Sequence, residues 1–297
     1  MNNIKTIFSD ELQYLDGLRS VLKYGTQKGD RTGTGTISLF RPQTMRFSLN
    51  NGLNFPLFTT KFVNFNAVLR ELLWFISGST NINDLESKIW DQWALTEDFV
   101  REDGTVIKAG EIGPMYGYIL RNDGHGGDPL QETIENIKKF PNSRRHVITL
   151  WRNEFVPDES ISPQDNVKND KGCLSTCHGT TIQFYVDGDK LSLSTYQRSC
   201  DLGLGGAFNV ASYSILLMMV AKLTGLKADQ VIYDFGDAHI YNNHLTQVDE
   251  WLSRSISSDL PSLEIIGEQK TIDDFKFEHF KLLDYKHQEA IKMPIAV

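Results

Sequence analysis

The sequence predicts a protein of mixed α and β structure that is built on a substantial sheet. Apolar residues mark two helical segments by their spacing, a third segment is apolar nearly all round, and short strand-like segments are joined by turn sequences. The chain has 297 residues, of which 40% are hydrophobic and 11% aromatic. This composition is ample for a sizeable core, and the length fits one large domain or two ordinary ones.

Three segments have the pattern of a helix. Residues 11–24 show an apolar stripe that predicts an amphipathic helix, which Gly25 ends. A second helix is expected over residues 68–76, where Glu71 stands among apolar side chains. A carboxyl group in such a place is either well partnered or raised in pKa, unless it faces the surface. Residues 210–223 are apolar nearly all round and predict a central buried helix.

Strands are expected in five segments. Two of them flank Asp187-Gly188-Asp189, which is a strong signal for a hairpin turn. The five segments are residues 37–40, 45–47, 146–151, 180–186 and 191–196. Residues 96–112 and 152–172 are polar, and we interpret both as inserted loops.

Charge and cysteine content exclude several classes of protein. The formal net charge of −8 argues against a general nucleic-acid binder, so no DNA partner is expected. The three cysteines form no even framework, and the four-residue step from Cys173 to Cys177 is not a usual zinc spacing. His239 and His244 are a poor metal pair because their spacing does not place them on one helical face. We therefore expect reduced thiols and no metal.

A cytoplasmic location is expected. Residues 1–6 carry no apolar signal segment, and the longest purely apolar run, residues 215–221, is far too short to span a bilayer. The sequence therefore predicts neither secretion nor a membrane partner.

Cys177-His178 and Arg198 are the candidates for chemistry. A guanidinium group near a thiol favours the thiolate, which is the reactive form, and a cation also suits an anionic substrate. The alternative is that Cys177 is a buried structural cysteine.

Motifs along most of the chain resemble those of the thymidylate synthase family. The resemblance runs from Lys23 to Val297 and includes two stretches around the candidate nucleophile, Cys177-His178 and the run from Tyr196 to Asp201. The other motifs are Asp30-Arg31-Thr32-Gly33-Thr34-Gly35-Thr36, Thr59-Thr60-Lys61, Glu71-Leu72-Leu73-Trp74-Phe75, Ile89-Trp90-Asp91-Gln92-Trp93, Gly113-Pro114-Met115-Tyr116-Gly117, Ser143-Arg144-Arg145, Gln183-Phe184-Tyr185, Phe208-Asn209-Val210-Ala211-Ser212-Tyr213, Gly236-Asp237-Ala238-His239-Ile240-Tyr241 and Ala296-Val297.

The resemblance implies an α+β fold with one domain over residues 1–297. A large mixed β-sheet would be flanked by helices, and two such sheets would pack back to back in a homodimer with shared active sites. Residues 96–112 and 152–172 would be polar insertions in this domain.

The resemblance also implies reductive methylation of dUMP to dTMP, with 5,10-methylenetetrahydrofolate as one-carbon donor and reductant. Cys177 would attack the pyrimidine ring, Arg198 would favour its thiolate, and Glu71 would manage protons through ordered water. The implied catalytic residues are Cys177, Glu71, Tyr116, His178, Arg198, Asp201 and Asn209. The implied dUMP ligands are Arg31, Arg198, Ser199, Gln197, Asp201, Asn209, His239 and Tyr241, with Arg144 and Arg145 from the second subunit.

The folate would lie over the nucleotide, against apolar and aromatic walls that suit a pterin ring. The implied folate residues are Lys61, Ile89, Trp90, Trp93, Leu174, Asp201, Gly205, Phe208, Ala296 and Val297.

Departures from the family pattern keep other functions open. Thr176 stands where the family commonly has Pro, and Gly179 stands where a bulkier residue is common. One alternative is a dUMP hydroxymethylase, in which water rather than hydride completes the reaction. Another is a catalytically silent homologue that binds nucleotide or RNA. Methylation is favoured by the presence of Trp90, Trp93 and Val297. These residues suit closure of the site against water, which hydride transfer needs.

Overall fold

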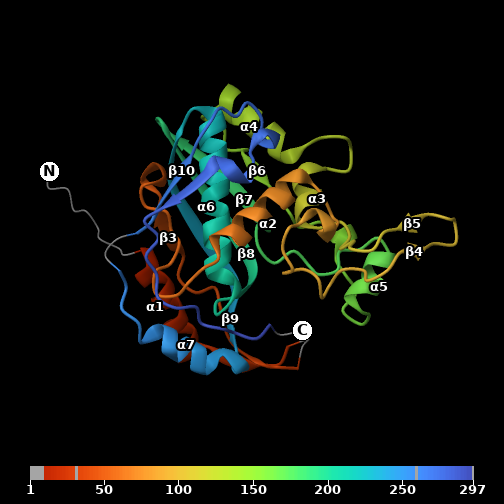
Figure 1. The fold of residues 1–297 in the computed structure, drawn as a ribbon, viewed down its shortest axis with the longest axis horizontal. Helices are drawn as coiled ribbons and strands as arrows, with labels where there is room; N and C mark the ends of the chain where they lie inside the picture. Colours follow the sequence, from red (N-terminus) through yellow and green to blue (C-terminus); the bar gives the residue numbers. More distant parts are fainter. Residues whose placement is uncertain (1–9, 31–32, 258–259, 296–297) are drawn as a thin grey trace.

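The computed structural model of the chain describes residues 10–30, 33–257 and 260–295 (Figure 1). The α-helices are α1 (Asp10–Tyr24), α2 (Phe65–Ser77), α3 (Tyr116–Arg121), α4 (Pro129–Lys139), α5 (Pro163–Lys168), α6 (Gly205–Thr224) and α7 (Leu245–Leu252). The strands are β1 (Thr26–Lys28), β2 (Thr36–Phe40), β3 (Met45–Ser48), β4 (Phe99–Val100), β5 (Val106–Ile107), β6 (Val147–Ile148), β7 (Thr181–Asp187), β8 (Lys190–Asp201), β9 (Lys227–Tyr241), β10 (Ser262–Ile265) and β11 (Phe280–Leu283).

A seven-stranded mixed sheet forms the framework. Its strand order is β1-β2-β9-β8-β7-β6, and β3 also pairs with β9. The long strands β8 and β9 run parallel, whereas all other neighbours in this sheet are antiparallel. Strand β9 pairs with β2 over residues 237–241 and with β3 over residues 230–233. The predicted large mixed sheet flanked by helices is therefore confirmed.

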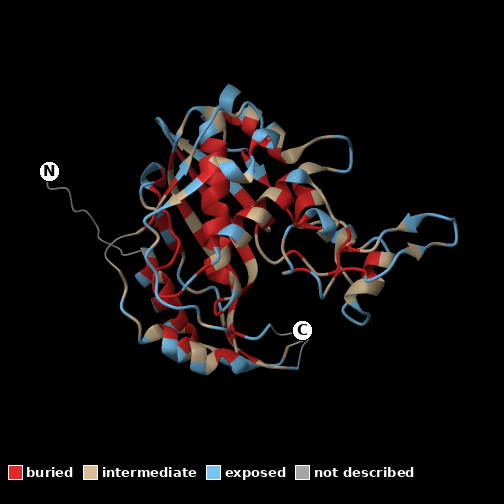
Figure 2. Ribbon diagram, viewed as in Figure 1, coloured by how far each residue is buried: buried red, intermediate tan, exposed pale blue. Residues whose placement is uncertain are grey.

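Helix α6 fills the centre of the molecule. It packs on β8 and β9, and it is buried along almost its whole length (Figure 2). Within the described residues it is the one helix long and apolar enough to cross a bilayer, but 83% of that window lies inside the protein. Helix α6 is therefore a core helix, and it begins at Gly205, five residues before the predicted start.

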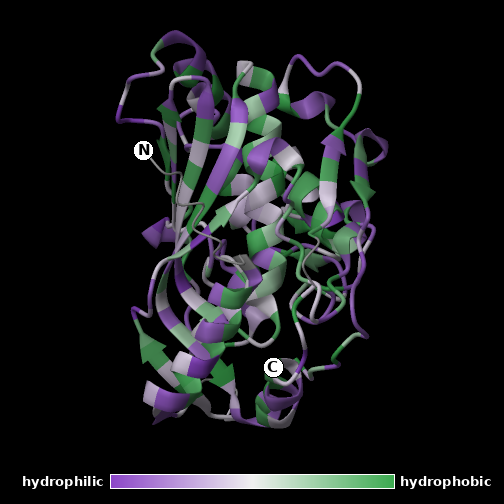
Figure 3. Cartoon of the chain, turned by 90° about the vertical axis from the view of Figure 1, so that its left-hand side faces the viewer, coloured by the Kyte–Doolittle hydropathy of each residue, from purple (hydrophilic) through white to green (hydrophobic). Residues whose placement is uncertain are grey.

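The two faces of the sheet are shielded from solvent to different extents. Phe184, Leu193 and Val231 point to the face that α6 covers and are fully buried or nearly so. Their neighbours on the strands alternate with them: Tyr185 is 66% exposed and Ile232 is half-buried. Figure 3 shows this alternation of hydrophilic and hydrophobic residues along the strands at the left of the molecule. The second face is thus only partly shielded within one chain.

Two predictions about secondary structure need correction. The segments interpreted as loops contain regular structure: β4 and β5 form a hairpin within residues 96–112, and α5 lies within residues 152–172. Ser162 caps α5 by accepting from the Asp165 N–H at 3.0 Å, and Pro163 follows at the first helical position, so the local sequence does favour a helix here. The predicted strand over residues 146–151 is shorter and spans only Val147–Ile148.

Candidate active site

Cys177 and Arg198 lie side by side, as the sequence predicts. The Arg198 Nη2 atom lies 3.6 Å from the Cys177 Sγ atom, and the Arg198 Nε atom donates to the Thr176 carbonyl at 3.3 Å. The backbone joins them as well, because the Arg198 N–H donates to the Cys177 carbonyl at 2.9 Å. The guanidinium also stands over the Trp151 ring at 5.3 Å, which helps to fix its position. This arrangement favours a thiolate at Cys177.

Tyr116 and His178 form the next layer of the site. The Tyr116 hydroxyl accepts the Cys177 backbone N–H at 2.9 Å, and the His178 ring stacks on the Tyr116 ring with 4.3 Å between centroids. The His178 Nδ1 atom lies 2.9 Å from the Tyr213 hydroxyl. Desolvation lowers the pKa of His178 to about 3, so the ring is neutral near pH 7. A neutral ring can orient its neighbours through the contacts with Tyr116 and Tyr213, but it carries no charge.

Glu71 lies on α2 in a buried setting. Its Oε1 atom accepts the Trp90 indole N–H at 2.8 Å. Burial raises the pKa of Glu71 to about 7, although the indole hydrogen bond acts in the opposite direction. A carboxyl group with this pKa can take up and release a proton near neutral pH.

Asp201 and Lys61 meet at the start of α6. The Asp201 Oδ1 atom accepts the backbone N–H groups of Gly203 and Leu204 at 2.8 and 3.2 Å. Lys61 Nζ donates to the Gly203 carbonyl at 2.8 Å and stands 4.0 Å from the Trp251 ring centre. Burial lowers the pKa of Lys61 to about 8, against the opposing effect of Asp201. The Lys61 side chain is thus enclosed beside Asp201.

Asn209 faces Gln197 between α6 and β8. The Asn209 Nδ2 atom donates to Gln197 Oε1 at 3.3 Å, and the Gln197 Nε2 atom donates to the Ser199 carbonyl at 3.0 Å. Both side chains are buried. The amide of Asn209 therefore has a fixed orientation, which a planar ligand with donors and acceptors requires.

The parallel pairing of β8 and β9 brings polar residues together. Ser199 pairs with Asp237, and Asp201 pairs with His239. Asp237 accepts from Ser38 Oγ at 2.8 Å and lies 3.2 Å from His239 Nδ1. These partners, His239 foremost, hold the pKa of Asp237 well below its usual range. The rings of His239 and Tyr241 lie next to each other, with 5.3 Å between centroids.

The predicted aromatic wall is built around Trp90. The Trp93 ring meets the Trp90 ring edge to face at 5.4 Å. The predicted residues Ile89, Leu174 and Phe208 are half-buried and pack against the core. Gly205 is the first residue of α6.

The contacts above do not include Arg144 and Arg145, which are predicted to serve the site of a second subunit. Arg144 and Arg145 are exposed in the segment that precedes β6. Arg31, Ala296 and Val297 lie outside the described residues. Among the residues that are described, no group of three or more His, Cys, Asp or Glu side chains could hold a metal ion.

Tyr213 is a site residue that sequence reasoning missed. Its hydroxyl contacts His178, although Tyr213 belongs to the apolar helix whose pattern indicates only core. The hydroxyl of a buried tyrosine needs a hydrogen-bond partner. A tyrosine in an apolar helix is therefore the sequence signal that could have indicated a polar contact at Tyr213.

Comparison with known proteins identifies the family. The family model described as thymidylate synthase matches residues 12–297. The chain belongs to the thymidylate synthase family. It is 46% identical to the thymidylate synthase of Francisella philomiragia subsp. philomiragia over 289 residues, which cover 96% of this chain and 99% of that protein. It is 45% identical, with the same coverage, to the thymidylate synthase of Francisella tularensis subsp. holarctica. The predicted family and enzyme class, a methyltransferase with thymidylate synthase activity, are confirmed.

Proposed function

We propose that the chain converts dUMP to dTMP with 5,10-methylenetetrahydrofolate as one-carbon donor and reductant, and that it acts in the cytoplasm. The observation that carries the proposal is the contact between Arg198 and Cys177 in a chain of the thymidylate synthase family. The Cys177 thiolate adds to carbon 6 of the uracil ring, and the enolate that results attacks the methylene group through carbon 5. Loss of the carbon-5 proton breaks the bond between the methylene group and the folate nitrogen, which leaves an exocyclic methylene group on the ring and releases tetrahydrofolate. Hydride transfer from tetrahydrofolate to this methylene carbon then expels the Cys177 thiolate from carbon 6 and yields dTMP and dihydrofolate.

Glu71 is the proposed proton-handling group. Its pKa of about 7 lets it exchange protons through water in the neutral range. The Tyr116 and His178 rings stack on each other, and the Tyr116 hydroxyl accepts the Cys177 backbone N–H, so both residues are proposed to position the nucleophile while the carbon-5 proton leaves.

The proposed dUMP site combines fixed polar groups with arginines. Asn209, held by Gln197, reads the uracil edge, and His239 and Tyr241 bind the sugar hydroxyl. Arginine forks match phosphate oxygens well. The proposed phosphate ligands are Arg31, Arg198 and Ser199, together with Arg144 and Arg145 of the partner subunit. Asp201 lies within the same proposed pocket.

The folate is proposed to lie against Trp90 and Trp93, where two aromatic rings already meet. The other proposed folate residues are Lys61, Ile89, Leu174, Asp201, Gly205, Phe208, Ala296 and Val297. The contact of Lys61 with Gly203 supports a role in shaping the turn that precedes α6.

A homodimer is proposed because one face of the sheet is only partly shielded within the chain. Tyr185 is 66% exposed there, and Arg41 stands over the Tyr196 ring at 5.5 Å. Exposed Arg144 and Arg145 precede the edge strand β6, where they could reach the site of a second subunit. Mixing an Arg145→Ala protein with a Cys177→Ser protein should restore some activity, since each mixed dimer holds one intact site. No rescue after verified subunit exchange would refute shared sites.

Product analysis tests the reaction. With dUMP and methylenetetrahydrofolate, the protein should form dTMP and dihydrofolate in equal amounts, and dihydrofolate is followed by its absorbance. Accumulation of 5-hydroxymethyl-dUMP without dihydrofolate would show a hydroxymethylase instead. Cys177→Ser should abolish turnover while dUMP binding stays measurable by calorimetry. Nucleotide binding without turnover in the unmodified protein would indicate a catalytically silent homologue.

A further inference from the structure

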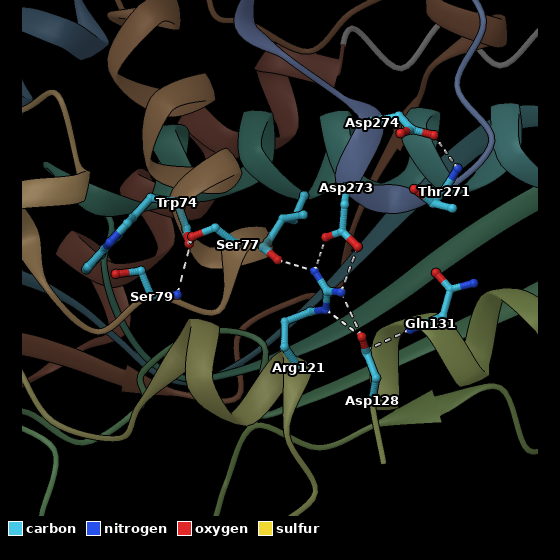
Figure 4. A network of polar contacts seen from close by, with 10 residues as sticks. Trp74, Ser77, Ser79, Arg121, Asp128, Gln131, Thr271, Asp273 and Asp274 are labelled. Atoms are coloured by element: carbon cyan, nitrogen blue, oxygen red, sulfur yellow. Dashed lines mark hydrogen bonds and ion pairs between the residues drawn. The ribbon is translucent and has the colours of Figure 1, made fainter. Parts of the chain in front are cut away.

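Arg121 joins four elements of the fold (Figure 4). It is the last residue of α3, and its Nε and Nη2 atoms lie 2.8 and 2.7 Å from Asp128 Oδ2 at the start of α4. Its Nη1 and Nη2 atoms donate to the two carboxylate oxygens of Asp273 at 2.6 and 3.2 Å. The Nη1 atom also donates to the Ile76 carbonyl in the last turn of α2. One guanidinium group thus ties α2, α3, α4 and the short 3-10 helix Ile272–Asp274 together.

The geometry of this junction is specific to arginine. The Arg121 side chain is only 15% exposed, and two carboxylates and one carbonyl receive its fork of N–H groups. Asp128 is itself fixed, because its Oδ1 atom caps α4 by accepting the Gln131 N–H at 3.0 Å. A positive charge at the carboxyl end of α2 is favourable as well. Lysine carries the charge but cannot make the same set of directed contacts.

The same two helices carry catalytic candidates. Glu71 lies on α2, five residues before Ile76, and Tyr116 begins α3, five residues before Arg121. The helices touch through their backbones, because a Cβ atom at Gly117 would lie 2.8 Å from the Phe75 carbonyl oxygen. The Phe75 and Tyr116 rings stack with 4.9 Å between centroids. A shift of α3 along α2 would therefore move Tyr116 relative to Glu71.

We propose that Arg121 is a positioning residue, which fixes α3 on the end of α2. It thereby keeps the Tyr116 hydroxyl in contact with the Cys177 backbone. It also keeps the Glu71 carboxyl group buried beside Trp90. This inference rests on the proposed function, in which Glu71 handles the proton. Arg121 lies at the end of α3 opposite to Tyr116, and it contacts α2 at Ile76, five residues after Glu71.

The first test compares Arg121→Gln with Arg121→Lys and with a control, Arg101→Gln. Arg101 is also paired, with Asp170 and the Lys168 carbonyl, but it lies outside α2 and α3. Arg121→Gln should lower kcat about 10- to 100-fold, as a misplaced catalytic group does, with a much smaller change in KM for dUMP. Arg121→Lys should recover part of the loss, and Arg101→Gln should retain wild-type kcat.

The second test follows the Glu71 carboxyl without substrate. The signal is the infrared carbonyl stretch of the protonated acid, which is assigned to Glu71 because it is lost in Glu71→Gln. In the wild type this signal should titrate near pH 7. In Arg121→Gln it should titrate at lower pH, because water reaches the carboxyl group. The ionisable neighbours Tyr116 on α3 and Tyr213 on α6 are held neutral by burial, which raises the pKa of each, so neither titrates in this range.

A folded Arg121→Gln protein with wild-type kcat and an unshifted infrared titration would overturn the proposal. Should Arg121→Gln not fold, Asp273→Asn keeps the contacts of Arg121 with Asp128 and Ile76 and should give a smaller shift in the same direction. An unshifted titration in Asp273→Asn would then overturn the proposal. A wild-type protein that forms no dTMP contradicts the proposed function instead, and the infrared titration still reports on Arg121.

Discussion

The guanidinium of Arg198 and the thiol of Cys177 lie 3.6 Å apart, and a backbone hydrogen bond joins the same two residues. The other two cysteines are unlike Cys177, because Cys173 and Cys200 are buried. Burial raises the pKa of Cys173 to about 12 and that of Cys200 well above its ordinary value. Only Cys177 therefore combines access to solvent with a neighbouring cation.

Arg198→Gln should slow alkylation of Cys177 by iodoacetamide at pH 7 about tenfold, because the thiolate loses the cation that favours it. Mass spectrometry of the modified peptide gives the rate, and Cys173 and Cys200 should stay unmodified over the same period. Arg152→Gln is the matched control, since Arg152 pairs with Glu154 rather than with the thiol. An unchanged alkylation rate in Arg198→Gln would contradict the electrostatic role.

Glu71 should make the protein less stable as the pH rises. Its pKa is about 7 in the folded protein against 4.5 ordinarily, so between these values the folded chain holds a proton that the unfolded chain has lost. Unfolding then releases a proton, and the free energy of unfolding falls by about 3 kcal/mol across this range. Glu71→Gln should lack this component. Urea denaturation at pH 4 and pH 8, at one protein concentration, measures the difference between the two proteins.

Sequence patterns predict the helices of the site better than its central strand. Helical spacing of the apolar residues indicates α2, and a long run that is apolar nearly all round indicates the buried helix α6. Strand β9 escapes prediction, since Gly236 and Asp237 are residues typical of turns. The structure accommodates both: a Cβ atom at Gly236 would lie 2.5 Å from the Arg198 carbonyl oxygen, and Asp237 pairs with Lys28.

Contacts within the site are predictable where a single hairpin joins the two partners, and not where the partners are far apart in the sequence. Cys177 and Arg198 can be paired because the hairpin at Asp187-Gly188-Asp189 folds one strand back on the other. The junction at Arg121 depends on Asp273, which is 152 residues away, and no local pattern indicates such a contact.

His244 should hold the C-terminal segment in place. Its Nε2 atom lies 2.6 Å from the Pro294 carbonyl oxygen, and its Nδ1 atom lies 3.7 Å from Asp201 Oδ1. His244→Leu removes both contacts, so digestion by carboxypeptidase should proceed further into the chain than in the wild type. The KM for folate should rise more than the KM for dUMP, because the C-terminal residues are proposed to cover the folate. Equal digestion of the two proteins would show that His244 does not anchor this segment.

Gly179 should be intolerant of any side chain, because Tyr213 occupies the space beside it. Its φ is +62°, and a Cβ atom there would lie 2.0 Å from the Tyr213 hydroxyl oxygen. Gly188 has nearly the same φ, +61°, but a Cβ atom at Gly188 would meet no other atom within 4 Å, so Gly188→Ala reports the backbone cost alone. Gly179→Ala should therefore lower the free energy of unfolding by about 1–3 kcal/mol more than Gly188→Ala does.

A double-mutant cycle separates the steric clash with Tyr213 from other causes of the stability lost in Gly179→Ala. Tyr213→Phe removes the hydroxyl oxygen, and with it the bond to His178, so alone it should destabilise the protein by about 1 kcal/mol. Combined with Gly179→Ala, it should restore part of the lost stability, because the atom nearest the new methyl group is gone. Urea denaturation of the four proteins measures the coupling. Additive losses would place the cost of Gly179→Ala in its backbone conformation and not in the contact with Tyr213.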